Sequence, residues 1–227
     1  MYFYIKNNLN HFKELLCGYA QSVHRDPATI KLLAVSKTFP ADAVKAAYES
    51  GQRMFGENKV QELETKCKLL PPDIEWHLIG HLQANKVAAA VEIASYIHSV
   101  DSEKLLNRIN RIAGEIGKKQ KILLEVNISG EESKFGLTVF DVESCVEIAL
   151  KSEHIELKGL MTMAPFEMEP KSIRKVFSDL RCLRDSLELK FNVSLPELSM
   201  GMSSDFKEAI VEGSTIVRIG TSIFGKR

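Results

Sequence analysis

Short apolar runs of strand-forming residues alternate with helical patterns along the chain. Eight such runs are recognisable: KLLAVSKT (31–38), RMFGEN (53–58), EWHLIG (75–80), YIHSVD (96–101), KILLEVNIS (121–129), KGLMTMA (158–164), PELSMGM (196–202) and TIVRIG (215–220). Helical patterns follow them at 43–48, 59–69, 84–94, 102–116, 138–151, 170–189 and 204–212, and only the segment SIFGKR follows the last run. This alternation indicates parallel strands joined by crossover helices.

A further helical pattern precedes the first strand. Within the first 24 residues, apolar side chains recur at roughly three- and four-residue spacing, at Phe3, Ile5, Leu9, Phe12, Leu15, Leu16 and Tyr19. We therefore predict an α/β fold, a (β/α)₈ TIM barrel with an extra N-terminal helix, and one domain over residues 1–227. The alternative is an open doubly wound sheet, but no GxGxxG follows the first strand, which disfavours its dinucleotide-binding form.

Charge and composition exclude several classes of function. The chain has 30 Lys and Arg against 30 Asp and Glu, so it lacks the basic excess that a nucleic-acid footprint requires. No apolar stretch approaches the ~20 residues of a membrane span, and the N-terminus does not resemble a secretory signal. The four cysteines lie far apart, and the pair His77 and His81, which could share one face, falls in a predicted strand and its exit loop rather than on a helix as in HExxH. We predict a cytoplasmic protein with no metal.

Polar and glycine residues gather where the predicted strands end, which is where barrels of this class place their chemistry. The first such residue is Lys37, directly after LLAVS. Partial burial at the barrel mouth would lower the pKa of this lysine and make its neutral amine available for Schiff-base chemistry. The alternative is an ordinary solvated lysine.

The last two strand exits resemble phosphate sites. In barrels, the loops after strands seven and eight frequently bind phosphate through backbone N–H groups. Ser203 and Ser204 stand at the first of these exits, and Gly220 and Thr221 stand at the second. Plain helix capping by serine and threonine is the alternative. Arg218, inside the run TIVRIG, would point into the barrel mouth and needs an acceptor there, either a structural carboxylate or a ligand atom.

The motifs around these residues resemble the pyridoxal phosphate homeostasis proteins, short relatives of the N-terminal barrel of alanine racemase (fold type III of the pyridoxal 5′-phosphate, or PLP, proteins). The resemblance runs nearly end to end, and it rests on LLAVSKTFP, FGENKVQE, WHLIGHLQANK, HSVDS, LLEVNISGEESKFGL, GLMTMAP, LSMGMSSDFKEAI and GSTIVRIGTSIFG.

The resemblance implies a role for each matching residue. Lys37 would form the internal aldimine with PLP, Arg218 would face the pyridine nitrogen, and a phosphate cradle would be formed by Ser203, Ser204, Gly220 and Thr221. The remaining cofactor-lining positions implied by the resemblance are Asn58, Ile79, His81 and Met200.

The resemblance implies a carrier that buffers or delivers PLP, with PLP-requiring apoenzymes as partners, and we assign no catalytic residue. The sequence stops at Arg227 without the β domain that supplies the second acid/base of alanine racemase, so we expect a monomer and no efficient racemisation. Two alternatives stay open: a PLP enzyme acting on a small amino acid, and a barrel aldolase or isomerase in which Lys37 reacts with a sugar phosphate.

Overall fold

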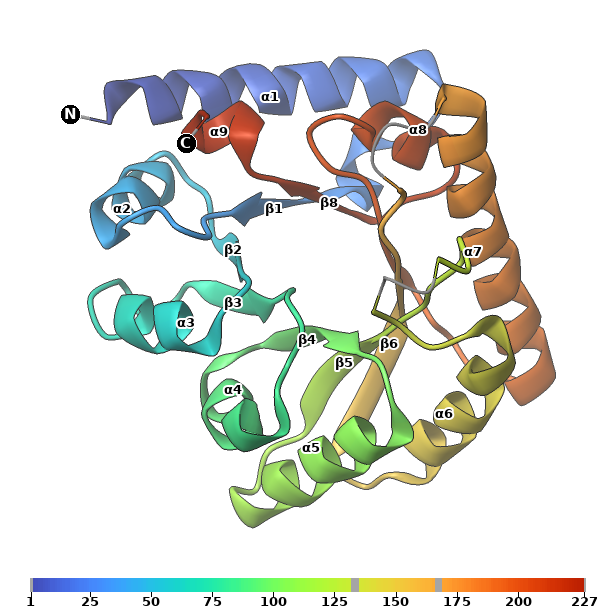
Figure 1. The fold of residues 1–227 in the computed structure, drawn as a ribbon. Helices are drawn as coiled ribbons and strands as arrows, with labels where there is room; N and C mark the ends of the chain where they lie inside the picture. Colours follow the sequence, from blue (N-terminus) through green and yellow to red (C-terminus); the bar gives the residue numbers. More distant parts are fainter. Residues whose placement is uncertain (1, 132–134, 166–168, 227) are drawn as a thin grey trace.

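Eight parallel strands close into a barrel in sequence order, β1 to β8 (Figure 1). The structure is a computed structural model, and it describes residues 2–131, 135–165 and 169–226. The strands are β1 (Lys31–Val35), β2 (Met54–Glu57), β3 (Glu75–Leu78), β4 (Tyr96–Val100), β5 (Gln120–Glu125), β6 (Ile155–Met161), β7 (Glu197–Ser199) and β8 (Ile216–Ile219). β8 pairs with β1 in parallel, which closes the barrel and confirms the predicted fold class.

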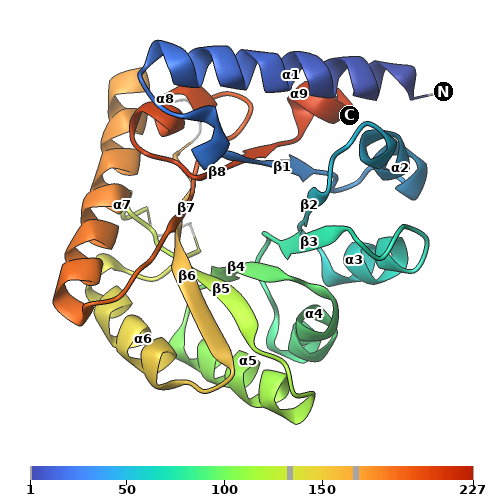
Figure 2. The same ribbon diagram turned by 180° about the vertical axis from the view of Figure 1, so that it is seen from behind.

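Helices surround the barrel on its outer side (Figures 1 and 2). They are α1 (Phe3–Ser22), α2 (Ala41–Glu49), α3 (Val60–Cys67), α4 (Val87–Ile93), α5 (Glu103–Glu115), α6 (Val139–Lys151), α7 (Pro170–Phe191), α8 (Phe206–Val211) and α9 (Thr221–Phe224), with short 3₁₀ turns η1 (Pro27–Thr29) and η2 (Ala84–Lys86). Within the described ranges, none of them combines the length and apolar character of a membrane-spanning helix.

Alternate residues of each strand face opposite sides of the sheet. Strand residues such as Ala34, Ile97 and Leu198 belong to the continuous apolar core between the sheet and the helices. Leu33 and Leu123 are fully buried but lie outside that core, so they point into the barrel interior. This alternation decides which strand-end residues can reach a ligand at the barrel mouth.

The extra N-terminal helix covers the side of the barrel next to β8, where the helix that follows the strand is short. Helix α1 packs against α2, α8 and α9 and lies beside α9 in Figure 1, and α9 has only four residues. Its buried stripe consists of Ile5, Leu9, Phe12, Leu16 and Ala20. Phe3 and Leu15, which the sequence pattern also placed on this stripe, are 85% and 39% exposed, so the true contact face is narrower than predicted.

The helix after β7 begins later than the sequence pattern predicts. Ser203 and Ser204 lie in a turn, and α8 starts only at Phe206 after the N-cap residue Asp205. The carboxylate of Asp205 accepts a hydrogen bond from the backbone N–H of Met202 and so closes this turn. The two serines therefore belong to the loop between β7 and α8 and are not the capping residues of the helix.

Candidate functional site

A cavity of about 810 Å³ opens at the carboxyl ends of the strands. Its lining includes nearly all the site residues predicted from the sequence, namely Lys37, Asn58, Ile79, His81, Ser203, Ser204, Arg218, Gly220 and Thr221. These residues are up to 184 positions apart along the chain, from Lys37 to Thr221, and the closed barrel brings them around one space.

Met200 is the exception among the predicted lining residues. Its side chain is fully buried in the apolar core between sheet and helices, and it does not line the cavity. The reason is strand alternation: Ser199 at the end of β7 faces the barrel interior, so the next side chain points to the outer face of the sheet. We assign Met200 to the packing of the barrel wall.

Two buried partners hold the backbone just before Lys37. The Ser36 hydroxyl donates to Glu57 Oε1 at 2.6 Å, and Lys66 Nζ donates both to the Ser36 carbonyl at 2.8 Å and to Glu57 Oε1 at 2.6 Å. All three residues are buried between β2, α3 and the end of β1. Because a hydrogen-bonded pair of buried charges tolerates little displacement, this cluster fixes the position from which Lys37 enters the cavity.

The backbone after Lys37 is also restrained. Thr38 adopts a left-handed conformation with φ of 68°, which is uncommon for a β-branched residue. Its backbone N–H donates to Glu62 Oε2 at 2.7 Å, and this bond compensates for the unfavourable conformation. Lys37 thus projects from a short segment that is anchored on both sides.

The turns after β7 and β8 present unused backbone donors to the cavity. Within the described residues, the N–H groups of Ser203, Ser204 and Thr221 donate no hydrogen bond to a protein acceptor. Ser222 N–H donates to Ser203 Oγ at 3.4 Å, which ties the two turns together. Backbone N–H groups that converge in this way can bind an anion such as phosphate.

Gly220 allows the turn after β8, which carries the unused N–H group of Thr221, to lie close to the end of β1. A Cβ atom at Gly220 would lie 3.3 Å from the carbonyl oxygen of Val35, tighter than ordinary contact. The absence of a side chain therefore allows the β8–α9 turn to sit close to the end of β1, where Lys37 begins its path into the cavity. The predicted cradle and the predicted lysine are neighbours in the structure.

Arg218 is almost completely buried, with 4% exposure, and it lines the floor of the cavity. Its Nη1 donates to the Ser199 carbonyl at 2.7 Å and to Ser199 Oγ at 2.8 Å, and its Nη2 donates to the Thr162 carbonyl at 2.9 Å. A guanidinium carries five N–H donors, so two are left for a ligand. Burial lowers the pKa of Arg218 to about 10, which still leaves it charged at neutral pH. No carboxylate in the described part of the chain forms an ion pair with it, so the structural ion-pair alternative is not supported.

His81 stands at the mouth of the cavity. Its Nδ1 lies 3.0 Å from Asp101 Oδ2, and its ring stacks on Phe135 with centroids 4.3 Å apart. Phe135 is a lining residue that the sequence reasoning missed. His77, the partner weighed for a metal pair, is fully buried inside the barrel and contacts His98 instead. Among the residues that the structure describes, no three His, Cys, Asp or Glu side chains are placed to hold a metal ion.

Glu125 is another lining residue that was not predicted from the sequence. It ends β5, which lies opposite β1 in a closed barrel of eight strands, and it is only 4% exposed. Burial, with a smaller effect from Asp101, raises the pKa of Glu125 to about 7 despite the opposing charge of Arg218. The signal was present in KILLEVNIS, since a charged residue inside an apolar strand needs an explanation.

We expect Glu125→Gln to change the pH dependence of folding. The folded protein keeps a proton on Glu125 that the unfolded chain releases near pH 4.5, so this group's contribution to the free energy of unfolding falls as the pH rises from about 4.5 to about 7. Glutamine does not ionise. Urea unfolding at pH 5 and pH 8 measures the free energy of unfolding. From the lower to the higher pH, this free energy should rise in the variant by about 2 to 3 kcal/mol relative to the wild type.

The matched control is Glu49→Gln on the exposed side of α2, which should unfold in parallel with the wild type at both pH values. If the difference in the free energy of unfolding between Glu125→Gln and wild type were the same at both pH values, the carboxyl group of Glu125 would be ionised in the folded protein.

The family model "Alanine racemase, N-terminal domain" matches residues 6–227. A relative from Aquifex aeolicus called "Pyridoxal phosphate homeostasis protein" is 44% identical over 198 residues, which is 87% of this chain and 87% of the relative. The chain belongs to the pyridoxal phosphate homeostasis protein family. The resemblance seen in the motifs is thereby confirmed.

Solved structures agree with this family. PipY of Synechococcus elongatus, solved with PLP bound, is 38% identical with a TM-score of 0.82, and the match covers 92% of this chain and 100% of that chain. An alanine racemase from Clostridium difficile has a TM-score of 0.72 at 17% identity, and the match covers 95% of this chain but 56% of the racemase. The likeness to the racemase concerns the fold alone.

Proposed function

We propose that this protein binds PLP in the cavity at the strand ends, holds it as a Schiff base on Lys37, and serves PLP homeostasis. One observation carries the proposal: a single cavity combines an anchored lysine, a corner of unused backbone N–H groups and a buried guanidinium with two unused donors. These are the partners that an aldehyde, a phosphate and a ring nitrogen require. The family name of the relatives and the PLP bound to PipY support it.

Each part of the cavity would meet one part of the cofactor. Lys37 supplies the amine for the covalent bond, and the turns at Ser203–Ser204 and Gly220–Thr221 bind the phosphate. Arg218 faces the ring nitrogen and donates a hydrogen bond to it. Asn58, Ile79 and His81 line the remaining wall. When bound, PLP supplies an electron-withdrawing ring, and many enzymes strengthen that ring by keeping its nitrogen protonated with a carboxylate.

Arg218 suits a carrier better than an enzyme. A guanidinium only donates hydrogen bonds, so the ring nitrogen it faces stays unprotonated and the ring withdraws electrons weakly. The protein would then hold PLP in a chemically quiet form and release it to PLP-requiring apoenzymes. A monomeric state and a cytoplasmic location are part of the same proposal, and size-exclusion chromatography with light scattering tests the former.

A second candidate, a slow PLP enzyme acting on a small amino acid, is favoured by one observation. Glu125 faces the cavity from the end of β5, opposite β1, which Lys37 follows, and its pKa of about 7 makes it able both to give and to take a proton. Two groups on opposite sides are what reversible proton transfer at one carbon requires.

Deuterium exchange separates the carrier from the enzyme. We expect the PLP-loaded protein, mixed with alanine or serine in deuterated water, to exchange the Cα proton of the amino acid slowly, because the ring facing Arg218 withdraws electrons weakly. Proton NMR measures the rate. In Arg218→Glu, if the variant folds and binds PLP, exchange should rise because a carboxylate keeps the ring nitrogen protonated.

Rapid exchange in the wild type, abolished by Glu125→Gln, would establish the enzyme instead. A Glu49→Gln variant serves as the control in both experiments. Absence of any absorption change when PLP is added to the protein would contradict PLP binding and would support the sugar-phosphate alternative for Lys37.

A further inference from the structure

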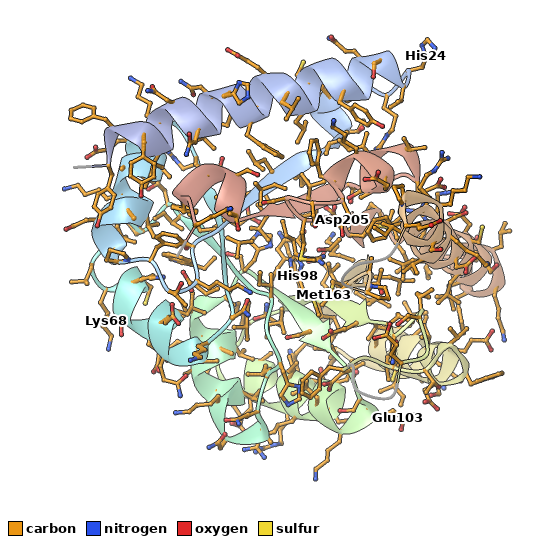
Figure 3. All side chains as sticks on the ribbon, turned by 45° about the horizontal axis from the view of Figure 1, so that its top comes forward. His24, Lys68, His98, Glu103, Met163 and Asp205 are labelled. Atoms are coloured by element: carbon orange, nitrogen blue, oxygen red, sulfur yellow. The ribbon has the colours of Figure 1, made fainter. Side chains whose placement is uncertain are left out.

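A chain of polar side chains crosses the interior of the barrel below the cavity. Arg218 Nη1 lies 2.8 Å from Ser199 Oγ, Ser199 Oγ lies 3.0 Å from His98 Nδ1, and His98 Nε2 lies 2.8 Å from His77 Nδ1. His77, His98 and Ser199 are fully buried, and His98 lies near the middle of the molecule in Figure 3, whereas Lys68 and Glu103 lie at its edge. Barrel interiors are usually filled with branched apolar residues, so this chain needs a reason.

The groups at the two ends of the chain, the Arg218 guanidinium and the Glu75 carboxylate beside His77 Nε2, set the direction of its hydrogen bonds. An arginine can only donate, so Ser199 Oγ accepts from Arg218, and because the described residues offer its own O–H no other acceptor, that O–H donates to His98 Nδ1. His98 must therefore carry its proton on Nε2 and donate to His77 Nδ1. His77 must in turn carry its proton on Nε2. The chain runs one way, away from the cavity.

The far end of the chain faces a carboxylate at the opposite end of the barrel. Glu75 Oε1 lies 3.4 Å from His77 Nε2, in a geometry that falls short of a formed hydrogen bond, and Glu75 is partly exposed. The Tyr96 ring stacks on the His77 ring with centroids 4.8 Å apart and an interplanar angle of 8°. This stacking holds His77 in its orientation. The chain thus extends from a buried cation to an anion on the solvent side.

Both histidines are neutral in this arrangement. Burial lowers the pKa of His77 and of His98, and the Arg218 charge adds to the effect on His98. Further charged groups near this end of the barrel include Lys121, the ion pair of Lys31 with Glu197 and the ion pair of Lys158 with Glu156. A neutral imidazole with one donor and one acceptor is what each position of the chain demands.

We propose that Ser199 and His98, with His77 behind them, are positioning residues that hold Arg218 in the orientation in which its two unused N–H groups face the ligand. This inference rests on the proposed function, because it takes the ring nitrogen of PLP as the ligand atom. His98 accepts the Ser199 proton and so holds the hydroxyl with a lone pair towards Arg218. Without that acceptor the hydroxyl can turn, and Arg218 loses one of the bonds that fix its plane.

The test compares PLP with its analogue that has C–H in place of the ring nitrogen. We expect wild type to bind PLP about tenfold or more tightly than the analogue, since a hydrogen bond to a charged donor is gained. In Ser199→Ala and His98→Leu this ratio should fall towards one, mainly through weaker binding of PLP. His98→Asn, whose amide oxygen can replace Nδ1 as acceptor, should restore much of the ratio. Fluorescence titration measures the affinities.

The control is Ile109→Val, which changes a fully buried residue of α5 in the core between sheet and helices, away from the barrel interior, and it should keep the wild-type ratio. A merely structural role of Ser199 and His98 would weaken both ligands equally and leave the ratio unchanged, which would overturn the inference. A ratio near one in the wild type would do the same. If the wild type bound neither ligand, the proposed function itself would fail.

A second measurement uses the wild-type protein, so it does not depend on whether a variant of the hydrogen-bonded chain folds. In protein labelled with ¹⁵N-histidine, the chain requires both His77 and His98 to carry a proton on Nε2 and none on Nδ1 at pH 7. NMR distinguishes the two tautomers through their nitrogen chemical shifts. A proton on Nδ1 of His98 would mean that Ser199 does not donate to it, and the proposed direction of the chain would be wrong.

Discussion

Replacing Lys37 with alanine is expected to abolish covalent attachment of PLP altogether. The wild-type protein incubated with PLP should be yellow, and borohydride should reduce the Schiff base to a stable secondary amine that peptide mapping finds on Lys37. The Lys37→Ala variant should give no reduced adduct. It should still bind PLP weakly, because the backbone donors at Ser203, Ser204 and Thr221 and the guanidinium of Arg218 are unaffected.

Lys226 provides the matched control for this experiment. It is the other described lysine that lines the cavity, so it tests whether any nearby amine would serve. We expect Lys226→Ala to form the adduct like the wild type. The reason is the support of the Lys37 segment by Ser36, Glu57 and Lys66, which fixes one amine within the cavity. An adduct mapped to Lys226, or one that persists in Lys37→Ala, would disprove the assignment.

Removing the phosphate from the ligand is expected to reduce its affinity by about a hundredfold or more. Pyridoxal lacks the anion that the turns after β7 and β8 would bind, and each charge-assisted hydrogen bond contributes about 1.5–3 kcal/mol, so two of them suffice for this factor. Titration of the protein with PLP and with pyridoxal, followed by absorbance, measures the difference.

A variant of the cradle sharpens this prediction. Ser203→Ala removes the hydroxyl that links the two turns through Ser222 N–H but leaves the backbone donors in place. The substitution should lower the affinity for PLP by about tenfold and leave the affinity for pyridoxal nearly unchanged. Equal affinity of the wild type for PLP and pyridoxal, or an equal loss for both ligands in Ser203→Ala, would show that this corner of the cavity does not bind the phosphate.

Local pattern was enough to predict the architecture. The alternation of apolar runs with helical spacing predicted all eight strands and the extra N-terminal helix, because burial on one face dictates the order of residues within a strand or a helix. Strand ends in a barrel meet at one rim, so the sequence also predicted that Lys37, Arg218, Gly220 and Thr221 would share a cavity. The motifs carried the family assignment.

Only the tertiary structure decided which side each strand-end residue faces and what it meets there. Strand alternation at β7 places the Ser199 side chain in the barrel interior and the Met200 side chain in the core outside the sheet. Because β7 has only three residues, its sequence pattern is too short to show which side chains face inward. The partners of Arg218, the position of Glu125 opposite Lys37 and the chain through His98 depend on strands distant in sequence, which closure of the barrel brings within hydrogen-bond distance. Such contacts leave no local pattern, because their spacing along the chain is arbitrary and only the closed barrel sets the distances between them.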